Sequence, residues 1–362
     1  MTRVVATAFG RFFLVRAWRC TPLFRQMSRA VMVMAVLLAL SNAVSAEGKP
    51  AALLHALWTQ SELAGTPAEH MVTRPYARPA DLSPPVRPWP SVRQLPVPGG
   101  LRGVIRRVRV AGGEKVLALT FDLCERASNR TGYRTEIVNH LRAHGVKATF
   151  FAGGKWMRSH PEQTMQLMAD PLFELGNHSW THANFALLDE QETLEQTLWT
   201  QSQYELLREE LARRAVRSGL EQEMRQVPLF MAVFRLPYGR SSEAALERLA
   251  GMGLPVVQWD VLGEGGAGSA RDMALRAARE VRPGSIVLMH ANAVPKLTQD
   301  IVPVFVEELA RQGWRFVTVS ELLAMGEAES VLDGYFEKPG DNVRFDSGYP
   351  GKGTLHPVPN TP

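Results

Sequence analysis

Residues 116–122 read VLALTFD, an almost continuous apolar run that ends in a carboxylate. Similar short runs recur along the chain and alternate with stretches of helical periodicity, which is typical of parallel strands joined by helices. We therefore expect seven strands, at Val116–Asp122, Ala148–Ala152, Phe173–His178, Met231–Pro237, Val256–Val261, Ser285–His290 and Arg315–Val319.

Helical patterns fill the intervals between these strands. They cover Glu136–His144, Glu190–Arg214, Glu243–Met252, Arg271–Val281 and Gln299–Gln312. Right-handed crossovers between successive parallel strands produce either an open sheet or a barrel. Seven such units favour an α/β fold built as a distorted, incomplete (β/α) barrel. The charged stretch of about 191–226 predicts a solvated helical insertion.

Residues 1–46 have the composition of a secretory signal peptide. They hold six arginines, no lysine and no acid, followed by the apolar run Ala30–Leu40 and the small residues Val44-Ser45-Ala46. The run is too short to span a bilayer core of about 30 Å. We expect cleavage after Ala46 and export to the periplasm or medium; an uncleaved anchor is the alternative. Met27 followed by the same run would also make a complete signal peptide.

The net charge gives no support for nucleic-acid binding. The whole chain carries +5 and residues 1–46 carry +6, so the remainder carries −1. Residues 47–103 are rich in proline and predict an extended segment, in which Ala51–Trp58 is either a docking helix or part of a linker. The catalytic domain is expected at 104–325, and the polar residues 326–362 as a poorly ordered tail.

Polar residues end five of the predicted strands. They are Asp122, His178, Arg235, Asp260 and His290. The carboxyl ends of parallel strands form the active face in α/β folds, so we expect these side chains to lie together.

Two histidines of this group have the spacing of metal ligands. His178 and His182 are four residues apart in His-Ser-Trp-Thr-His, after a turn at Gly176-Asn177. Two imidazoles so placed can face one ion, and catalytic zinc sites keep one position open for water. Asp122 requires a partner because an unpaired buried carboxylate is costly, and a metal or Arg235 would provide one.

These segments, read in order, resemble the motifs of the polysaccharide deacetylase family, the NodB-like carbohydrate esterases. The resemblance runs from about Val116 to Leu323, and its motifs lie at 120–122, 178–182, 235–238 and 288–290. It implies a distorted barrel in which two histidines and an aspartate bind zinc, or cobalt or nickel, and the metal activates water.

The resemblance also implies roles for individual residues. Asp122 would be the general base, His290 the general acid and Arg235 the group that orients Asp122. The backbone N–H of Tyr238 would donate to the oxyanion. These parts suit amide hydrolysis, which requires an activated water, stabilisation of a tetrahedral intermediate and a proton for the leaving amine.

Two positions depart from the family pattern. Leu123 stands where the family has its metal-binding aspartate, so the third ligand is open between Glu125, Asp122 and Cys124. The fourth motif offers only Asp260 and Glu264, either of which could tune His290 or Arg235. Cys124 is the only cysteine outside the leader, and it is expected as a free thiol because Cys20 lies within the leader.

We therefore expect a hydrolase that removes N-acetyl or O-acetyl groups from an amino-sugar polysaccharide, without a transmembrane segment in the mature chain. Trp180, Trp259 and Tyr238 are candidates to stack on sugar rings, although Trp259 also suits a core. A catalytically degenerate glycan-binding module is one alternative. A cysteine hydrolase that uses Cys124 with His290 or His178 is another.

Overall fold

The computed structural model describes residues 52–69, 74–75 and 81–348. The predicted signal peptide at 1–46 lies outside the described residues. Within the described ranges, no helix combines the length and apolarity needed to cross a membrane.

The sheet is built around the strand quoted above. β3 (Val116–Leu123) is buried along its whole length and pairs in parallel with β5 (Ala148–Ala152), β9 (Ser285–His290) and β10 (Arg315–Val317). A strand buried on both faces needs apolar residues on both, which explains why its sequence does not alternate.

The sheet curls until its ends are joined by isolated bridges. β5 pairs with β6 (Phe173–Asn177), and Phe234 bridges Asn177 on one side and Val256 on the other. Val256 begins β7 (Val256–Val257), which pairs in parallel with β2 (Val104–Val110). β2 also pairs with β9, which is a neighbour of β3, so the series of paired strands closes on itself. The predicted distorted α/β barrel is confirmed.

Two predicted strands are shorter than expected. Met231–Pro237 contributes only the bridges at Phe234, and Val256–Val261 divides into β7 and β8 (Val261–Leu262). Phe234 still exchanges backbone hydrogen bonds with its neighbours, since its N–H donates to Pro255 and its carbonyl accepts from Val257. The register is therefore that of a strand, but too few residues take part to form a ladder.

One strand pair was not predicted. β2 pairs antiparallel with β11 (Gly326–Val331), and Arg107 binds Glu329 across the pair at 2.9 Å. After β11 the chain continues to α12 (Arg344–Gly348). The expectation of a poorly ordered tail from residue 326 is thus wrong as far as Gly348. An edge strand needs little apolar content because one side faces solvent.

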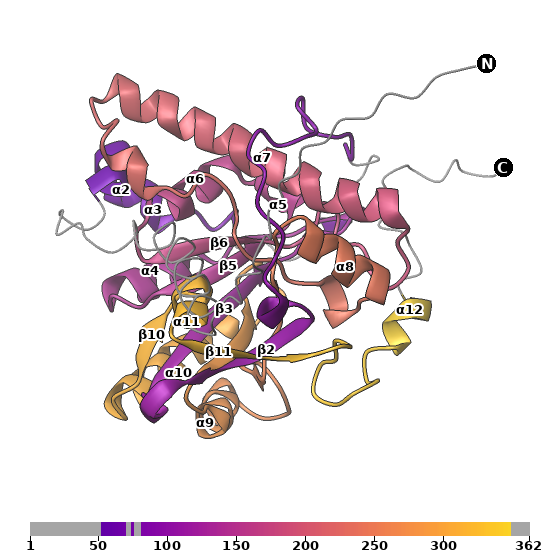
Figure 1. Cartoon of the computed structure of the whole chain (residues 1–362). Helices are drawn as coiled ribbons and strands as arrows, with labels where there is room; N and C mark the ends of the chain where they lie inside the picture. The colour runs from indigo at the N-terminus through magenta and orange to yellow at the C-terminus, as the bar shows by residue number, and fades with distance from the viewer. Residues whose placement is uncertain (1–51, 70–73, 76–80, 349–362) are drawn as a thin grey trace, which may run out of the picture. The chain divides into compact units, whose positions relative to one another are not determined.

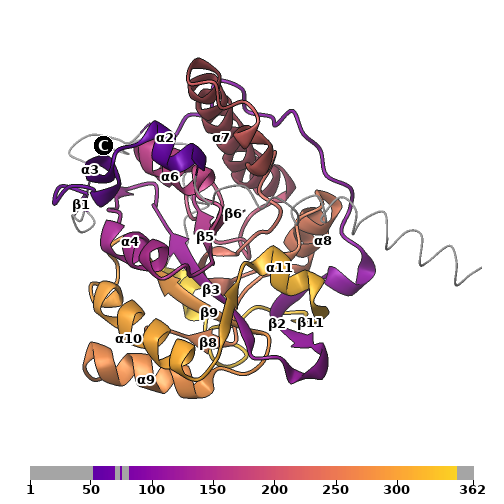
Figure 2. The same cartoon turned by 90° about the vertical axis from the view of Figure 1, so that its left-hand side faces the viewer.

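The helices cover the outside of the sheet. In Figure 2, α4, α10 and α9 follow one another down the left-hand side of the strands, while Figure 1 shows α7 crossing near α5 and α6. Their bounds are α4 Thr135–Ala143, α5 Gly154–Ser159, α6 Pro161–Ala169, α7 Glu190–Arg217, α8 Glu243–Gly251, α9 Ala270–Glu280, α10 Thr298–Arg311 and α11 Val319–Ala324.

The proline-rich segment contributes to the core. α2 (Ala52–Leu57) and α3 (Gln60–Ala64) lie in its first part, and Leu53, Leu54 and Trp58 are buried in the main apolar cluster. Of the two interpretations offered by the sequence, the docking helix is therefore the one observed. The remaining short elements are β1 Arg74–Pro75, β4 Asn129–Arg130, η1 Gly99–Leu101, η2 Ala111–Gly113, η3 Glu223–Gln226 and η4 Pro237–Gly239.

Candidate metal centre and active site

The carboxyl ends of the central strands surround one cavity. Asp122 on β3 lies opposite His290 on β9 in the parallel register, and Ala152 on β5 lies opposite Asn177 at the end of β6. The cavity measures about 300 Å³. Its lining includes Asp122, Cys124, His182, Leu236, Tyr238, Trp259, His290, Asn292 and Phe336.

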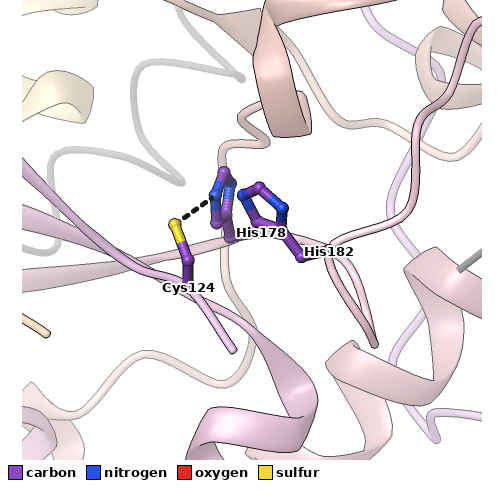
Figure 3. A group of neighbouring side chains, drawn as sticks. All are labelled: Cys124, His178 and His182. Carbon is purple, nitrogen blue, oxygen red and sulfur yellow. Dashed lines mark hydrogen bonds between the residues drawn. The ribbon is translucent and has the colours of Figure 1, made fainter. Parts of the chain in front are cut away.

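Three potential metal ligands point toward one another at this edge (Figure 3). The ligand atoms of Cys124, His178 and His182 all lie within 4.8 Å of one another. The Cys124 Sγ is 3.3 Å from the His178 Nε2. One thiol and two imidazoles form a donor set that suits zinc.

The tautomer of His178 follows from its other contact. Its Nδ1 lies 2.9 Å from the backbone carbonyl of Arg235, which can only accept, so Nδ1 carries the proton. The Nε2 lone pair then faces Cys124 and Asp122, whose Oδ2 is 3.6 Å away. A metal-ligating histidine typically donates its second ring nitrogen to such a carbonyl.

Two features of His182, its backbone conformation and an unpaired ring nitrogen, are consistent with a metal ligand. Its φ is +59°, a conformation that non-glycine residues rarely adopt, and its buried Nδ1 has no hydrogen-bond partner among the described residues. Its ring centre is 4.9 Å from that of His178. Strained backbone and an unsatisfied ring nitrogen beside a second histidine fit a ligand role.

Helix α7 holds the loop between the two histidines. The Oε1 of Gln196, a buried residue, accepts from the backbone N–H groups of both Trp180 and Thr181 at 2.9 Å. Asn177 donates to the carbonyl of Thr197 at 2.9 Å. The stretch predicted as a solvated insertion therefore presents a buried polar face to residues 177–182, called the metal loop below. This differs from the expectation that the helix is solvated.

Asp122 is paired with a fully buried cation. Arg235 Nη1 donates to Asp122 Oδ1 at 2.9 Å and to the hydroxyl of Thr120 at 2.7 Å. Its other nitrogens donate to the backbone carbonyls of Val257 and Gln258. A guanidinium that is hydrogen-bonded through each of its nitrogens keeps the carboxylate oriented.

His290 is oriented by Glu264. The His290 Nδ1 lies 2.9 Å from Glu264 Oε2, and the His290 backbone N–H donates to the other carboxylate oxygen at 2.6 Å. Thr298 also donates to Glu264. Of the two candidates in the weak fourth motif, Glu264 is thus the one that reaches His290.

The charges at the cavity reinforce one another. Burial opposes ionisation of Cys124, but the neighbouring His182 and His178 outweigh it and hold the pKa of the thiol well below its usual value. Burial likewise disfavours a charged His290, yet Glu264 and Cys124 raise its pKa well above the usual value. The pKa of His178 is also raised, because Asp122 and Cys124 outweigh its burial.

Tyr238 lies in the turn η4 with φ +58°. The residue lines the cavity, and its ring centre is 4.5 Å from that of His182 and 5.6 Å from that of Phe345. Asn342, which is completely buried, donates to the carbonyls of Gly239 and Gly334. The segment before α12 therefore supports this turn.

The tentative assignment of Glu125 as a metal ligand is wrong. Its carboxylate is 1% exposed and accepts from Lys155 and Ser159 at 2.6 Å and from the Thr131 N–H at 3.0 Å. Neither group of closely spaced ligand atoms among the described residues includes it. A buried ammonium captures this carboxylate and directs it away from the histidines.

Two predicted substrate-binding residues lie elsewhere. Asp260 accepts from the Ile286 N–H at 2.9 Å and from Ser285, at the start of β9 and therefore at the end opposite His290. Trp180 is completely buried against Trp199 and donates to the carbonyl of Leu82. Its position between the two histidines suggested exposure, but the turn directs its ring inward. Trp259 is buried and yet lines the cavity.

Phe336 and Asn342 were missed by sequence reasoning. They follow β11 in a polar stretch without helical or strand periodicity, and only their aromatic and amide side chains distinguish them from a loop. Phe336 lines the cavity beside Trp259, with ring centres 5.1 Å apart.

Comparisons with known proteins relate this chain to deacetylases. The family model described as "Polysaccharide deacetylase" matches residues 109–257. A relative, "Peptidoglycan-N-acetylglucosamine deacetylase PgdA" of Listeria monocytogenes, is 30% identical over 252 residues, which are 68% of this chain and 46% of that protein. The chain thus spans less than half the length of that relative.

Two further proteins illustrate the range of similarity. "Chitooligosaccharide deacetylase" of Bradyrhizobium sp. is 29% identical over 44% of this chain and 65% of its own length. A solved structure of a "CE4 family pseudoenzyme" from Bacillus anthracis is 24% identical, covers 61% of this chain and 69% of that one, and gives a TM-score of 0.49. On this match over residues 109–257 and on its strand-end residues, the chain is similar to the polysaccharide deacetylase family.

Proposed function

We propose that the protein is a metal-dependent hydrolase that removes N-acetyl, or O-acetyl, groups from an amino-sugar polysaccharide outside the cytoplasm. The observation that carries this proposal is the convergence on one cavity of the Cys124, His178 and His182 cluster, the Asp122–Arg235 pair and the His290–Glu264 pair. A core would not need three charged or metal-binding groups at adjoining strand ends.

His178 and His182 would hold the divalent ion, with zinc favoured over cobalt or nickel. The unpaired Nδ1 of His182 and the tautomer of His178 fit such a ligand role. When bound, the ion supplies Lewis acidity, which polarises the acyl carbonyl and makes water a stronger nucleophile.

The other residues divide the proton transfers. Asp122, oriented by Arg235, accepts the proton of the attacking water as the water oxygen bonds to the acyl carbon. The N–H of Tyr238 donates to the oxygen that becomes negative. His290 then gives its Nε2 proton to the sugar nitrogen as the carbon–nitrogen bond breaks, and Glu264 stabilises the imidazolium.

The nature of the substrate rests on the names of the relatives and on the cavity wall. One relative is named as a peptidoglycan-N-acetylglucosamine deacetylase and another as a chitooligosaccharide deacetylase. Tyr238, Trp259 and Phe336 add aromatic surface to the cavity, which suits the apolar faces of sugar rings. Export rests on the composition of residues 1–46.

The decisive experiment measures metal content and acetate release from N-acetylglucosamine oligomers, before and after chelation. We expect bound zinc and acetate release that chelation stops and zinc restores. His178→Ala should lose metal and activity together, whereas Asp260→Asn, at the other end of β9, should retain metal.

Two other outcomes would reject the proposal. Sugar binding without acetate release from the metal-loaded protein would support the degenerate glycan-binding module. Activity that survives chelation but is lost on alkylation of Cys124 would support the cysteine hydrolase.

A further inference from the structure

We propose that the Cys124 thiolate is the third protein ligand of the metal, so that the centre is a cysteine–histidine–histidine site. The inference rests on the proposed function only in requiring that a divalent ion binds between His178 and His182. It concerns the third protein ligand, because Leu123 stands where the family has its metal-binding aspartate and has no donor atom.

The separation of the donor atoms suits a shared ion. Zinc binds sulfur at about 2.3 Å and imidazole nitrogen at about 2.0–2.1 Å, so two such ligands of a tetrahedral ion lie roughly 3.5 Å apart. The Cys124 Sγ and the His178 Nε2 are separated by 3.3 Å. Figure 3 shows the sulfur and both rings directed at the same space.

The alternation of side chains along a strand explains why the ligand is Cys124 rather than its neighbour. Asp122 and Cys124, two residues apart, both line the cavity, whereas Leu123 is buried in the main apolar core. Successive side chains of a strand point to opposite faces. At the end of β3, a ligand at 124 therefore shares the face of Asp122.

The backbone of Cys124 is held by two side-chain hydrogen bonds. Its carbonyl accepts from Thr131 Oγ1 and from Asn292 Nδ2, both at 2.8 Å. These hydrogen bonds come from the loop after β3 and from the residues after β9. A ligand held from two sides loses little freedom on binding, which favours affinity.

The competing carboxylates have other partners. Glu125 is bound by Lys155, and the Oδ1 of Asp122 accepts from Arg235. Ligation by Cys124 leaves Asp122 available for proton transfer, so the two tasks belong to different residues. A soft thiolate should also make the site prefer zinc or cobalt over magnesium and manganese.

Cobalt reports directly on a thiolate ligand. The wild-type protein loaded with Co²⁺ should show a near-ultraviolet band from sulfur-to-cobalt charge transfer. Cys124→Ser should lose this band, while Asp122→Asn should retain it. Retention of the band in Cys124→Ser, or its absence from the cobalt-loaded wild type, would overturn the inference.

Zinc affinity supplies a second measurement that does not depend on activity. We expect Cys124→Ser to weaken zinc binding by about 100-fold or more, since even the loss of a ligand's hydrogen-bond partner typically costs about 10–100-fold. Cys124→Asp should restore part of the affinity and shift preference toward manganese. Unchanged affinity and preference in both folded variants would reject Cys124 as ligand.

The two proposals can fail separately. A cobalt–thiolate band in a protein that releases no acetate would leave the ligand assignment intact and reject the deacetylase. Chelator-sensitive acetate release without such a band would support the deacetylase and reject Cys124 as a ligand. Circular dichroism of each variant verifies that it is folded.

Discussion

Arg235 and Glu264 each fix one reacting side chain through direct hydrogen bonds, and each brings a charge into the barrel to do so. Arg235 is completely buried and donates four hydrogen bonds. Two go to the backbone carbonyls of Val257 and Gln258, and Nη1 donates the other two, to Thr120 and Asp122. The guanidinium is therefore satisfied without solvent, and its loss should affect stability as well as orientation.

Replacement of Arg235 by methionine should destabilise the fold. The change leaves the Asp122 carboxylate buried without its cation, and breaking a buried ion pair from one side typically costs about 3–5 kcal/mol. Denaturant unfolding measures the loss, with the exposed Arg282→Met as the matched control. A loss no greater than that of the control would show that Asp122 does not depend on Arg235.

Replacement of Glu264 by glutamine should reduce kcat with little change in KM. Glu264 contacts His290, so its charge matters when the imidazole transfers a proton. We expect a loss of about 10–100-fold, part of the ~10²–10⁴-fold that general acid–base catalysis contributes. Steady-state kinetics measures this, and Glu264→Asp should recover part of the rate. A rise in KM alone would contradict the positioning role.

The sequence predicted the residues whose chemistry is tied to a strand end. Asp122, His178, Arg235 and His290 meet because parallel strands bring their carboxyl ends to one edge. The mistaken assignments of Glu125 and Trp180 depended on side-chain direction, whereas Asp260 lies just before β8 and not at the end of a strand. Glu125 lies close to the site along the chain, but Lys155, a residue distant in sequence, decides where its carboxylate points.

At the scale of elements, helix α7 is the main support of the metal loop. Its amides and backbone carbonyls bind the segment that contains His178 and His182, and that segment includes two residues with positive φ, Ser179 and His182. Such backbone persists only where the surroundings hold it in place. The charge pattern of the helix reveals its exposed side, whereas its buried glutamines and threonines resemble solvent-facing residues in sequence.

Replacement of Gln196 by alanine should weaken zinc binding without removing a ligand. The buried amide oxygen holds the N–H groups of Trp180 and Thr181, so its loss should cost about 10-fold in affinity, as for other groups that orient ligands. Competition with a chromogenic chelator measures the affinity. Gln191→Ala, at an exposed position of the same helix, is the control, and equal affinities in the two variants would contradict this coupling.

Replacement of Asn342 by alanine should destabilise the protein and impair substrate binding. The buried amide donates to the carbonyls of Gly239 and Gly334, and buried groups left unpaired cost about 1–3 kcal/mol. Because the turn η4 carries Tyr238, KM should rise as well. Unfolding and kinetics are compared with the exposed neighbour Val343→Ala. If the two variants have the same stability and the same KM, the segment before α12 does not support the site.

At the scale of the whole molecule, the barrel is closed by contacts between distant parts of the chain. The parallel units could be predicted because each apolar strand is followed by a helical pattern. The β2–β11 pair could not, since Arg106, Arg107 and Arg109 interrupt the apolar run of β2 and β11 is mostly polar. Cross-strand pairing supplies a stabilisation that neither segment reveals alone.

Zinc should stabilise the entire fold because its ligands come from different strands. At a free concentration 100 times its Kd, an ion that binds only the native state adds about 2.7 kcal/mol to the free energy of unfolding. Calorimetric melting with and without zinc measures this effect, and His178→Ala should abolish it. A melting temperature that does not respond to zinc in the wild-type protein would argue against a site formed by the native fold.

The pairing of β2 with β11 also has a consequence for the timing of synthesis. Arg106 on β2 donates to the carbonyls of Tyr335 and Phe336, so the strand that borders the barrel early in the chain is completed by residues made long after it. Chains emerge from the ribosome at about 5–20 residues per second, and domains generally fold as units. Cys124, His178 and His182 are therefore synthesised several seconds before Phe336, and the aromatic wall of the cavity is among the last parts of the site to be made.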